Sequence, residues 1–164
     1  NLDGLFEISP KIIDDKRGWF MRYYSIDVFK KNISDFDSNW VQMNHSFTKK
    51  KGTWRGFHYQ IPPFQETKLI RCISGKVMDY VIDLRKNSKT FLSIYKTILS
   101  KENNLMLYIP KGFAHGFQCL SKTCVVCYKC DNYQDKKSEK TLLWNDKKLN
   151  IKLEKILISD FKLL

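Results

Sequence analysis

The sequence predicts an all-β protein, an antiparallel sandwich or barrel with one or two short helices. β-Branched and aromatic residues gather in short segments that are separated by turn signals. Hydrophobic residues make up 43% of the 164 residues, enough for a substantial core. Helical periodicity is almost absent. We therefore expect residues 1–164 to form a single domain.

One helix is predicted over residues 25–31, with Ser25 as its N-cap and with Val28 and Phe29 facing inward. Turns are predicted at residues 74–75, 86–88 and 102–104, which are rich in Gly, Asn and Ser. Between and around them, the predicted strands cover residues 40–47, 67–73, 76–84, 90–99, 106–109, 117–120 and 124–130.

The chain is basic, with 29 Lys+Arg against 17 Asp+Glu and a formal net charge of +12. The lysines are scattered in twos and threes, as on a solvated surface, so we expect no nucleic-acid partner. A small molecule that carries phosphate would suit this charge. No run of 18 apolar residues and no signal-like leader is present, so we expect a cytoplasmic protein without a membrane partner.

The cysteines favour a reducing compartment, because there are five of them and an odd number does not fit a disulfide framework. Cys124, Cys127 and Cys130 are spaced like metal ligands, but their segment is a predicted strand. On a strand, residues i and i+3 point to opposite faces. We therefore interpret them as buried thiols and predict no metal site.

Polar residues interrupt several segments that otherwise look like strands, at residues 14–20, 42–46 and 55–60. In the last of these, regular alternation would place Arg55, Phe57 and Tyr59 on one face. Gly56, His58 and Gln60 would then share the other face. A plain core does not need His and Gln on an inward face, although a hydrogen-bonded core histidine is the simpler alternative.

Residues 110–117 fit the Pro-x-Gly-x-x-His pattern of the second cupin motif, in which a glycine turn aims His115 into a barrel. Metal cupins also carry His-x-His, whereas His58 is followed at the second position by Gln60. We therefore expect a cupin-like barrel without a metal or other cofactor. A metal-dependent cupin enzyme remains an alternative.

Taken together, these segments resemble the dTDP-4-dehydrorhamnose 3,5-epimerase family over about residues 14–151. The matching elements are, in order, Asp15-x-Arg17-Gly18-x-Phe20, Gln42-x-Asn44-x-Ser46, Lys51-Gly52-x-x-Arg55-Gly56-x-His58-x-Gln60, Lys68-Leu69-Ile70-Arg71-Cys72, Gly75-Lys76-Val77-x-Asp79, Asp83-Leu84-Arg85-x-x-Ser88-x-Thr90-Phe91, Tyr108-Ile109-Pro110-x-Gly112-Phe113-Ala114-His115-Gly116-Phe117, Tyr128-Lys129 and Trp144-Asn145-Asp146.

The resemblance implies a cupin-like jelly roll, a homodimer, and epimerisation of a nucleotide-linked 4-keto sugar for surface polysaccharide, such as capsule or lipopolysaccharide. C3 and C5 both flank the C4 ketone, so either proton can be removed to give an enolate and returned from the opposite face. Such chemistry needs a base, an acid and a positive group for the enolate oxygen. An epimerase acting at C3 alone and a non-enzymatic binding module are the alternatives.

The resemblance also implies residue roles. It makes His58 the base, Lys68 the group that stabilises the enolate, and Tyr128 the acid. Asp160 is the candidate carboxylate that orients His58, with Asp83 as an alternative. The expected substrate-binding residues are Arg17, Arg22, Gln42, Asn44, Ser46, Arg55, Gln60, His115 and Glu139.

Three positions depart from the family pattern, and all three belong to its nucleobase pocket. Arg22 stands where the family has Glu, Gln134 where it has an aromatic residue, and Ile13 where it has Phe. An arginine can only donate hydrogen bonds, so it suits the acceptor edge of guanine. These changes favour a GDP-linked 4-keto heptose, with dTDP-4-keto-6-deoxyglucose as the next candidate.

Overall fold

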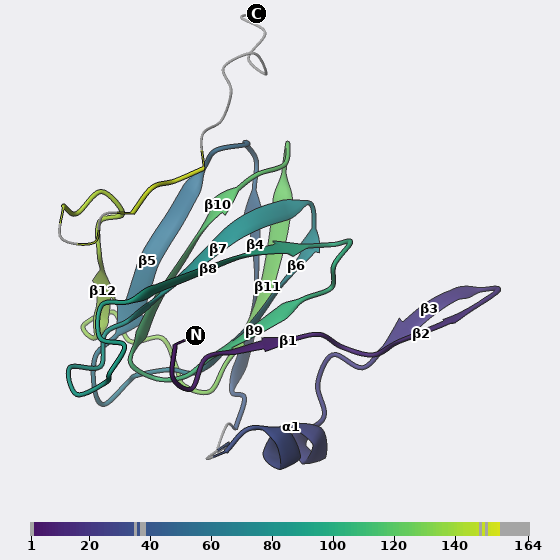
Figure 1. Ribbon diagram of the computed structural model, residues 1–164, viewed down its shortest axis with the longest axis horizontal. Helices are drawn as coiled ribbons and strands as arrows, with labels where there is room; N and C mark the ends of the chain where they lie inside the picture. The colour runs from purple at the N-terminus through teal and green to yellow at the C-terminus, as the bar shows by residue number, and fades with distance from the viewer. Residues whose placement is uncertain (1, 35, 37–38, 148, 150, 155–164) are drawn as a thin grey trace, which may run out of the picture.

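The computed structural model describes residues 2–34, 36, 39–147, 149 and 151–154. One helix and twelve strands are assigned within them (Figure 1). The elements are β1 (Phe6–Ile8), β2 (Ile12–Asp15), β3 (Gly18–Met21), α1 (Ile26–Asn32), β4 (Gln42–Thr48), β5 (Trp54–Gln60), β6 (Lys68–Ser74), β7 (Lys76–Asp83), β8 (Ile94–Ser100), β9 (Met106–Ile109), β10 (Phe113–Cys119), β11 (Cys124–Cys130) and β12 (Glu139–Thr141).

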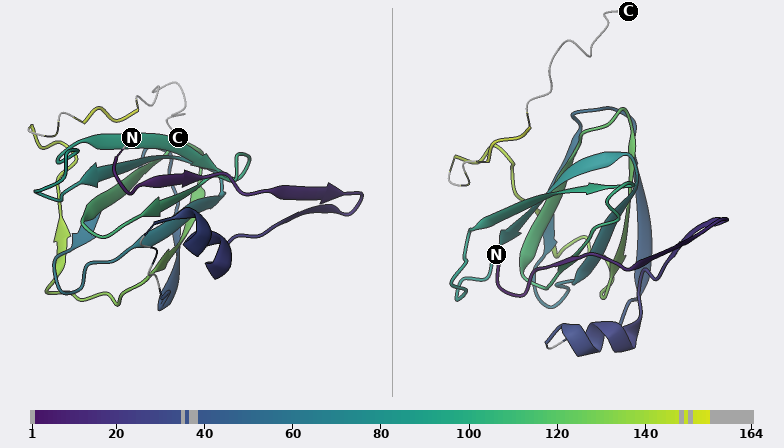
Figure 2. Two further views of the ribbon diagram at one scale, coloured as in Figure 1. Left: turned by 60° about the horizontal axis from the view of Figure 1, so that its bottom comes forward. Right: turned by 45° about the vertical axis from the view of Figure 1, so that its right-hand side comes forward.

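Two five-stranded antiparallel sheets face each other, and this confirms the predicted all-β class. Their strand orders are β1-β9-β6-β11-β4 and β12-β5-β10-β7-β8, here called the first and the second sheet. Strands β2 and β3 form a separate hairpin that projects away from the two sheets (Figures 1 and 2). Among the described residues, no helix is long and apolar enough to cross a membrane.

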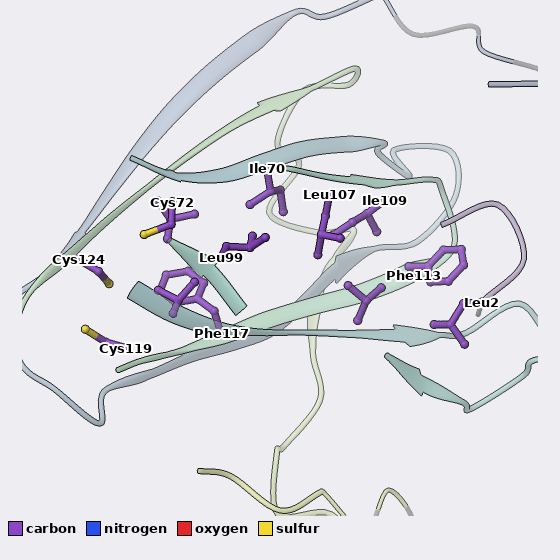
Figure 3. Packing of buried hydrophobic residues seen from close by; sticks show 13 residues of the cluster. Leu2, Ile70, Cys72, Leu99, Leu107, Ile109, Phe113, Phe117, Cys119 and Cys124 are labelled. Carbon is purple, nitrogen blue, oxygen red and sulfur yellow. The ribbon is translucent and has the colours of Figure 1, made fainter. Parts of the chain in front are cut away.

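The main core fills the space between the two sheets, and Figure 3 shows its side chains. Ile70 and Leu107 come from the first sheet, and Leu99 and Phe117 from the second. A separate cluster forms on the second sheet around Phe57 and Tyr80, with partly buried apolar residues from 142–153 packed against it. Polar side chains of both sheets line a cavity beside this core, and the candidate site lies there.

Most predicted elements are confirmed, but the helix and two strands need correction. Strand β8 begins at Ile94, four residues after the predicted start, because residues 90–92 form a turn. The helix begins one residue later than predicted, and Ser25 occupies the N-cap position without a side-chain capping bond. Phe29 is buried in a cluster with Leu69 and Tyr108, whereas Val28 is 46% exposed, so the prediction for Val28 was wrong. Adjacent helical residues are about 100° apart, so Phe29 can face the sheet while Val28 points away. Strand β10 begins at Phe113, four residues before the predicted start.

Candidate active site

A cavity of about 250 Å³ is lined by polar residues of both sheets. The first sheet contributes Gln42, Asn44 and Ser46 from β4, Lys68 and Tyr128 from β6 and β11, and Cys130 at the end of β11. The β4 residues are every second residue, and the intervening Met43, His45 and Phe47 are exposed. A polar face turned inward is thus a direct consequence of the strand period of two.

The second sheet contributes Arg55, His58 and Gln60 from β5, His115 and Phe117 from β10, and Glu139 from β12. His58 pairs with His115 across the β5–β10 ladder, and Glu139 pairs with Gln60 across β12–β5. Four of the expected substrate-binding residues on this sheet therefore lie beside the proposed base.

Strand β5 breaks the alternation that the sequence suggested, because Arg55 and His58 line the same cavity. The β5–β10 register shifts between His115 and Phe117, and such an irregularity re-aims side chains. Phe57 is instead fully buried in the cluster with Tyr80. Gly56 lies at this break with φ +116°, and a Cβ there would sit 2.6 Å from Gly116 Cα. Only glycine fits so close a strand contact at that φ.

A buried carboxylate holds His115, and sequence reasoning gave it no role. The Nε2 atom of His115 lies 3.0 Å and 2.9 Å from the two carboxylate oxygens of Asp79. Asp79 is fully buried on β7, and this burial raises its pKa while His115 opposes the rise. The sequence signal that could have indicated its role is a single carboxylate in the otherwise apolar centre of a predicted strand, within a segment that matches the family.

The surroundings of His58 favour its neutral form. Burial lowers the pKa of His58, and the nearby charge of Lys68 lowers it further, whereas Glu139 acts in the opposite direction. Its Nδ1 atom lies 3.4 Å from the hydroxyl oxygen of Thr141, the residue that pairs with it on β12. Among the described residues no hydrogen bond of Nε2 is found, so this nitrogen can face a ligand.

Two carboxylates, Asp160 and Asp83, are the candidates for orienting His58. Asp160 lies outside the described residues. Asp83 accepts hydrogen bonds from Arg85, Ser88 and Thr90, which hold its pKa well below the usual range. The alternative that Asp83 orients His58 was therefore wrong, because the carboxylate oxygens of Asp83 accept hydrogen bonds from the loop after β7.

Lys68 and Tyr128 face the cavity from the first sheet. The Nζ atom of Lys68 lies 2.9 Å from Oε1 of Glu66, which also lines the cavity and which sequence reasoning missed. Burial raises the pKa of Tyr128, and the neighbouring Cys130 and Glu66 raise it further. Tyr128 therefore remains a protonated phenol at neutral pH.

Three expected substrate-binding residues differ in placement from the others. The Gln60 side chain is engaged within the chain: its Nε2 donates to the carbonyls of Phe64 and Tyr133, and its Oε1 accepts from the amide of Asp135. Arg17 has an 83% exposed side chain that pairs with Asp15 on the projecting hairpin. Arg22 is also exposed, directly after that hairpin, and neither arginine is among the residues lining this cavity.

Within the described residues, no group of three or more His, Cys, Asp or Glu side chains converges as metal ligands would. The predicted strand over residues 124–130 is confirmed, and its three cysteines are free thiols. The thiol of Cys130 has its pKa raised to about 12, first by burial and then by Glu66. It is therefore protonated and poorly nucleophilic.

Comparisons with known proteins agree with this geometry. The family model described as dTDP-4-dehydrorhamnose 3,5-epimerase matches residues 1–161. A protein of that name from Shigella flexneri is 42% identical over 153 residues, which cover 92% of this chain and 83% of the relative. The relative from Salmonella typhimurium is 41% identical over 144 residues, 88% of this chain and 78% of its own.

Solved structures give the same result. The crystal structure of dTDP-4-dehydrorhamnose 3,5-epimerase from Elizabethkingia anophelis superposes with a TM-score of 0.87 and 40% identity, covering 92% of this chain and 81% of that one. An epimerase from Legionella pneumophila in complex with dTDP-4-keto-L-rhamnose gives a TM-score of 0.85 and 37% identity, covering 92% and 78%.

Proposed function

The chain belongs to the dTDP-4-dehydrorhamnose 3,5-epimerase family, and from this premise we propose that it epimerises a dTDP-linked 4-keto-6-deoxy sugar at C3 and C5. One observation carries the proposal. His58 and Tyr128 line one cavity from opposite sheets, and Lys68, at the start of β6, lines it from the first sheet. A sugar ring held between the sheets would present one face to a base and the other to an acid.

The proposed mechanism uses these three side chains. His58 removes the proton from the carbon next to the ketone, and the electron pair moves to the C4 oxygen to form an enolate. The Lys68 ammonium stabilises the negative charge on that oxygen. Tyr128 then gives its proton to the carbon from the opposite face, which inverts the centre. Exchange with solvent returns both side chains to their starting forms, so the step needs no redox partner.

The electrostatics of the site support this assignment of base and acid. A lowered His58 pKa keeps the imidazole neutral and able to accept a proton at pH 7. A raised Tyr128 pKa keeps the phenol able to donate. Arg55 lies three residues before His58 on β5 and lines the same cavity. Its guanidinium is suited to bind the diphosphate of the substrate through charge-assisted hydrogen bonds.

The expected preference for a GDP-linked heptose finds no support in the comparisons, whose relatives are named for dTDP sugars. That expectation placed Arg22 in the base pocket, but Arg22 is outside the cavity of its own chain. The proposal therefore takes the dTDP-linked sugar as substrate.

The projecting hairpin supports a homodimer. Residues 12–20 are all exposed, and among them are Trp19 at 55% and Phe20 at 59%. Large exposed apolar side chains on a projecting element are typical of an interaction surface. We propose that the hairpin packs on a second copy and brings Arg17 to the partner's cavity. Trp19→Asp should then give a monomer in light scattering, and a dimer in that variant would contradict this arrangement.

The experiment that tests the activity is incubation of dTDP-4-keto-6-deoxyglucose with the protein in heavy water, followed by proton NMR. Deuterium at C3 and C5 is the expected result, and deuterium at C3 alone would identify a C3 epimerase instead. A GDP-linked 4-keto sugar in a parallel reaction tests the nucleotide. No exchange at either carbon of the dTDP sugar would refute the proposed activity.

A further inference from the structure

Glu66 and Lys68 form an ion pair inside the cavity. Their atoms Oε1 and Nζ are 2.9 Å apart, and each side chain is only 12% exposed. The two residues are separated by one position, Lys68 begins β6, and both side chains line the cavity. The mechanism proposed above uses Lys68 and gives Glu66 no role.

The backbone that carries this pair is held by the two residues that follow β11. The amide of Thr67, between the two residues, donates to Oδ1 of Asp131 at 2.6 Å. The Asp131 carboxylate is buried and also lies 3.4 Å from the ammonium of Lys111. The preceding carbonyl, of Gln65, accepts from Nδ2 of Asn132 at 3.2 Å. Hydrogen bonds to the residues that follow β11 therefore hold the backbone of the pair at the start of β6.

The strand registers place Arg55 and this pair at opposite ends of the cavity. On β11, Cys130 pairs with Lys68 and with Gln42, whereas Ser46 pairs with Val126, four residues earlier. Arg55 donates to the hydroxyl of Thr48 and the carbonyl of Phe47, at the Ser46 end of β4. One end of the cavity is thus positive through Arg55, and at the other end Glu66 offsets the charge of Lys68.

We propose that Glu66 is a positioning and specificity residue: it anchors the Lys68 ammonium and keeps that end of the cavity neutral, so that the diphosphate of the substrate binds at Arg55 and the sugar binds at Lys68. The inference rests on the proposed function for the identity of the sugar nucleotide. Its physical basis is general, because an unpaired buried ammonium attracts phosphate oxygens. Without Glu66, Lys68 would compete with Arg55 for the diphosphate.

Binding of inorganic diphosphate tests this charge arrangement without any need for turnover. In calorimetric titrations, Glu66→Gln should bind diphosphate about tenfold more tightly than the wild type, because the Lys68 ammonium in the cavity then lacks its ion-pair partner. The double variant Glu66→Gln with Lys68→Met replaces the pair by two neutral side chains and should return to the wild-type affinity. A gain below about twofold in E66Q, or a gain that persists in the double variant, would overturn the proposal.

Glu139→Gln is the matched control. It also removes a carboxylate from the cavity, but the Glu139 carboxylate accepts its hydrogen bond from the neutral side chain of Gln134. A gain in E139Q as large as that in E66Q would show an effect of total charge and would also overturn the proposal. Should E66Q fail to fold, Lys68→Met replaces it. Its diphosphate affinity should fall about tenfold and be restored by adding E66Q.

Exchange kinetics then connect the pair to the reaction. In E66Q, kcat for deuterium exchange should fall while inorganic diphosphate inhibits at about tenfold lower concentration than in the wild type. Unchanged inhibition by diphosphate would contradict the specificity role. Absence of exchange in the wild type would refute the proposed function alone, since the binding series still decides the role of Glu66.

Discussion

Gly56→Ala is the substitution that most directly tests how the fold positions the two cavity histidines. A Cβ at residue 56 would lie 2.6 Å from Gly116 Cα and 2.7 Å from the carbonyl oxygen of His115. Both atoms belong to the backbone of the adjacent strand, which cannot move aside as a flexible side chain can. The new methyl group would therefore force β5 and β10 apart where His58 faces His115.

The magnitude follows from two contributions. Holding alanine at φ +116° costs about 1–3 kcal/mol, and overpacking against fixed backbone costs about 1–3 kcal/mol more. Gly18→Ala is the control, because Gly18 has φ +127° but no atom of its own chain lies within 4 Å of a built Cβ. It should lose only the first contribution.

Urea unfolding of the wild type and both variants measures these losses, and equal m-values would justify comparing them. G56A should be less stable than G18A by at least about 1 kcal/mol. G56A should also lose deuterium exchange at temperatures where it remains folded, because its histidines are displaced. Equal stabilities of G56A and G18A, with full activity in G56A, would refute the reasoning.

Three further predictions concern the reaction and the core. The pH profile of exchange should keep its acid limb below 6.5, the ordinary pKa of histidine, because a base with a lowered pKa stays unprotonated to lower pH; an acid limb above that value would contradict the assignment of His58. The alkaline limb should lie above pH 10.0, the ordinary pKa of tyrosine, because a raised pKa keeps the Tyr128 phenol protonated. Loss of activity below that pH, with the fold intact by circular dichroism, would argue against Tyr128 as the acid. Tyr128→Phe should slow epimer formation about 10²–10⁴-fold and slow proton removal less, which the ratio of deuterium in recovered substrate and product measures; equal losses in both would show that Tyr128 acts before the enolate.

Strand assignments were predictable where apolar residues and turn signals coincide. Strand β11 follows its predicted bounds, residues 124–130, and β9 its predicted bounds, residues 106–109. The short strands β1 and β12 have three residues each, too few to show a period. Whether Asp160 orients His58 stays a prediction, since it lies outside the described residues.

The site was predictable as a set of residues but not as an arrangement. His58, Lys68 and Tyr128 line one cavity, as the family motifs led us to expect. The face of Arg55 was mispredicted because a register shift in the neighbouring strand cannot be seen in local alternation. Asp79 and Glu66 were missed because their significance depends on contacts with His115 and Lys68. Arg17 does not line the cavity of its own chain, because it lies on the hairpin that projects away from the two sheets.

The most direct test of the central claim compares the wild type with His58→Asn in heavy water with dTDP-4-keto-6-deoxyglucose. Asparagine is of similar size and cannot act as a base near neutral pH, so the cavity should keep its shape. The wild type should incorporate deuterium at C3 and C5, and H58N should incorporate none at either carbon while still binding the nucleotide. Exchange at wild-type rates in H58N would contradict the account, because the proton would then be removed by another group.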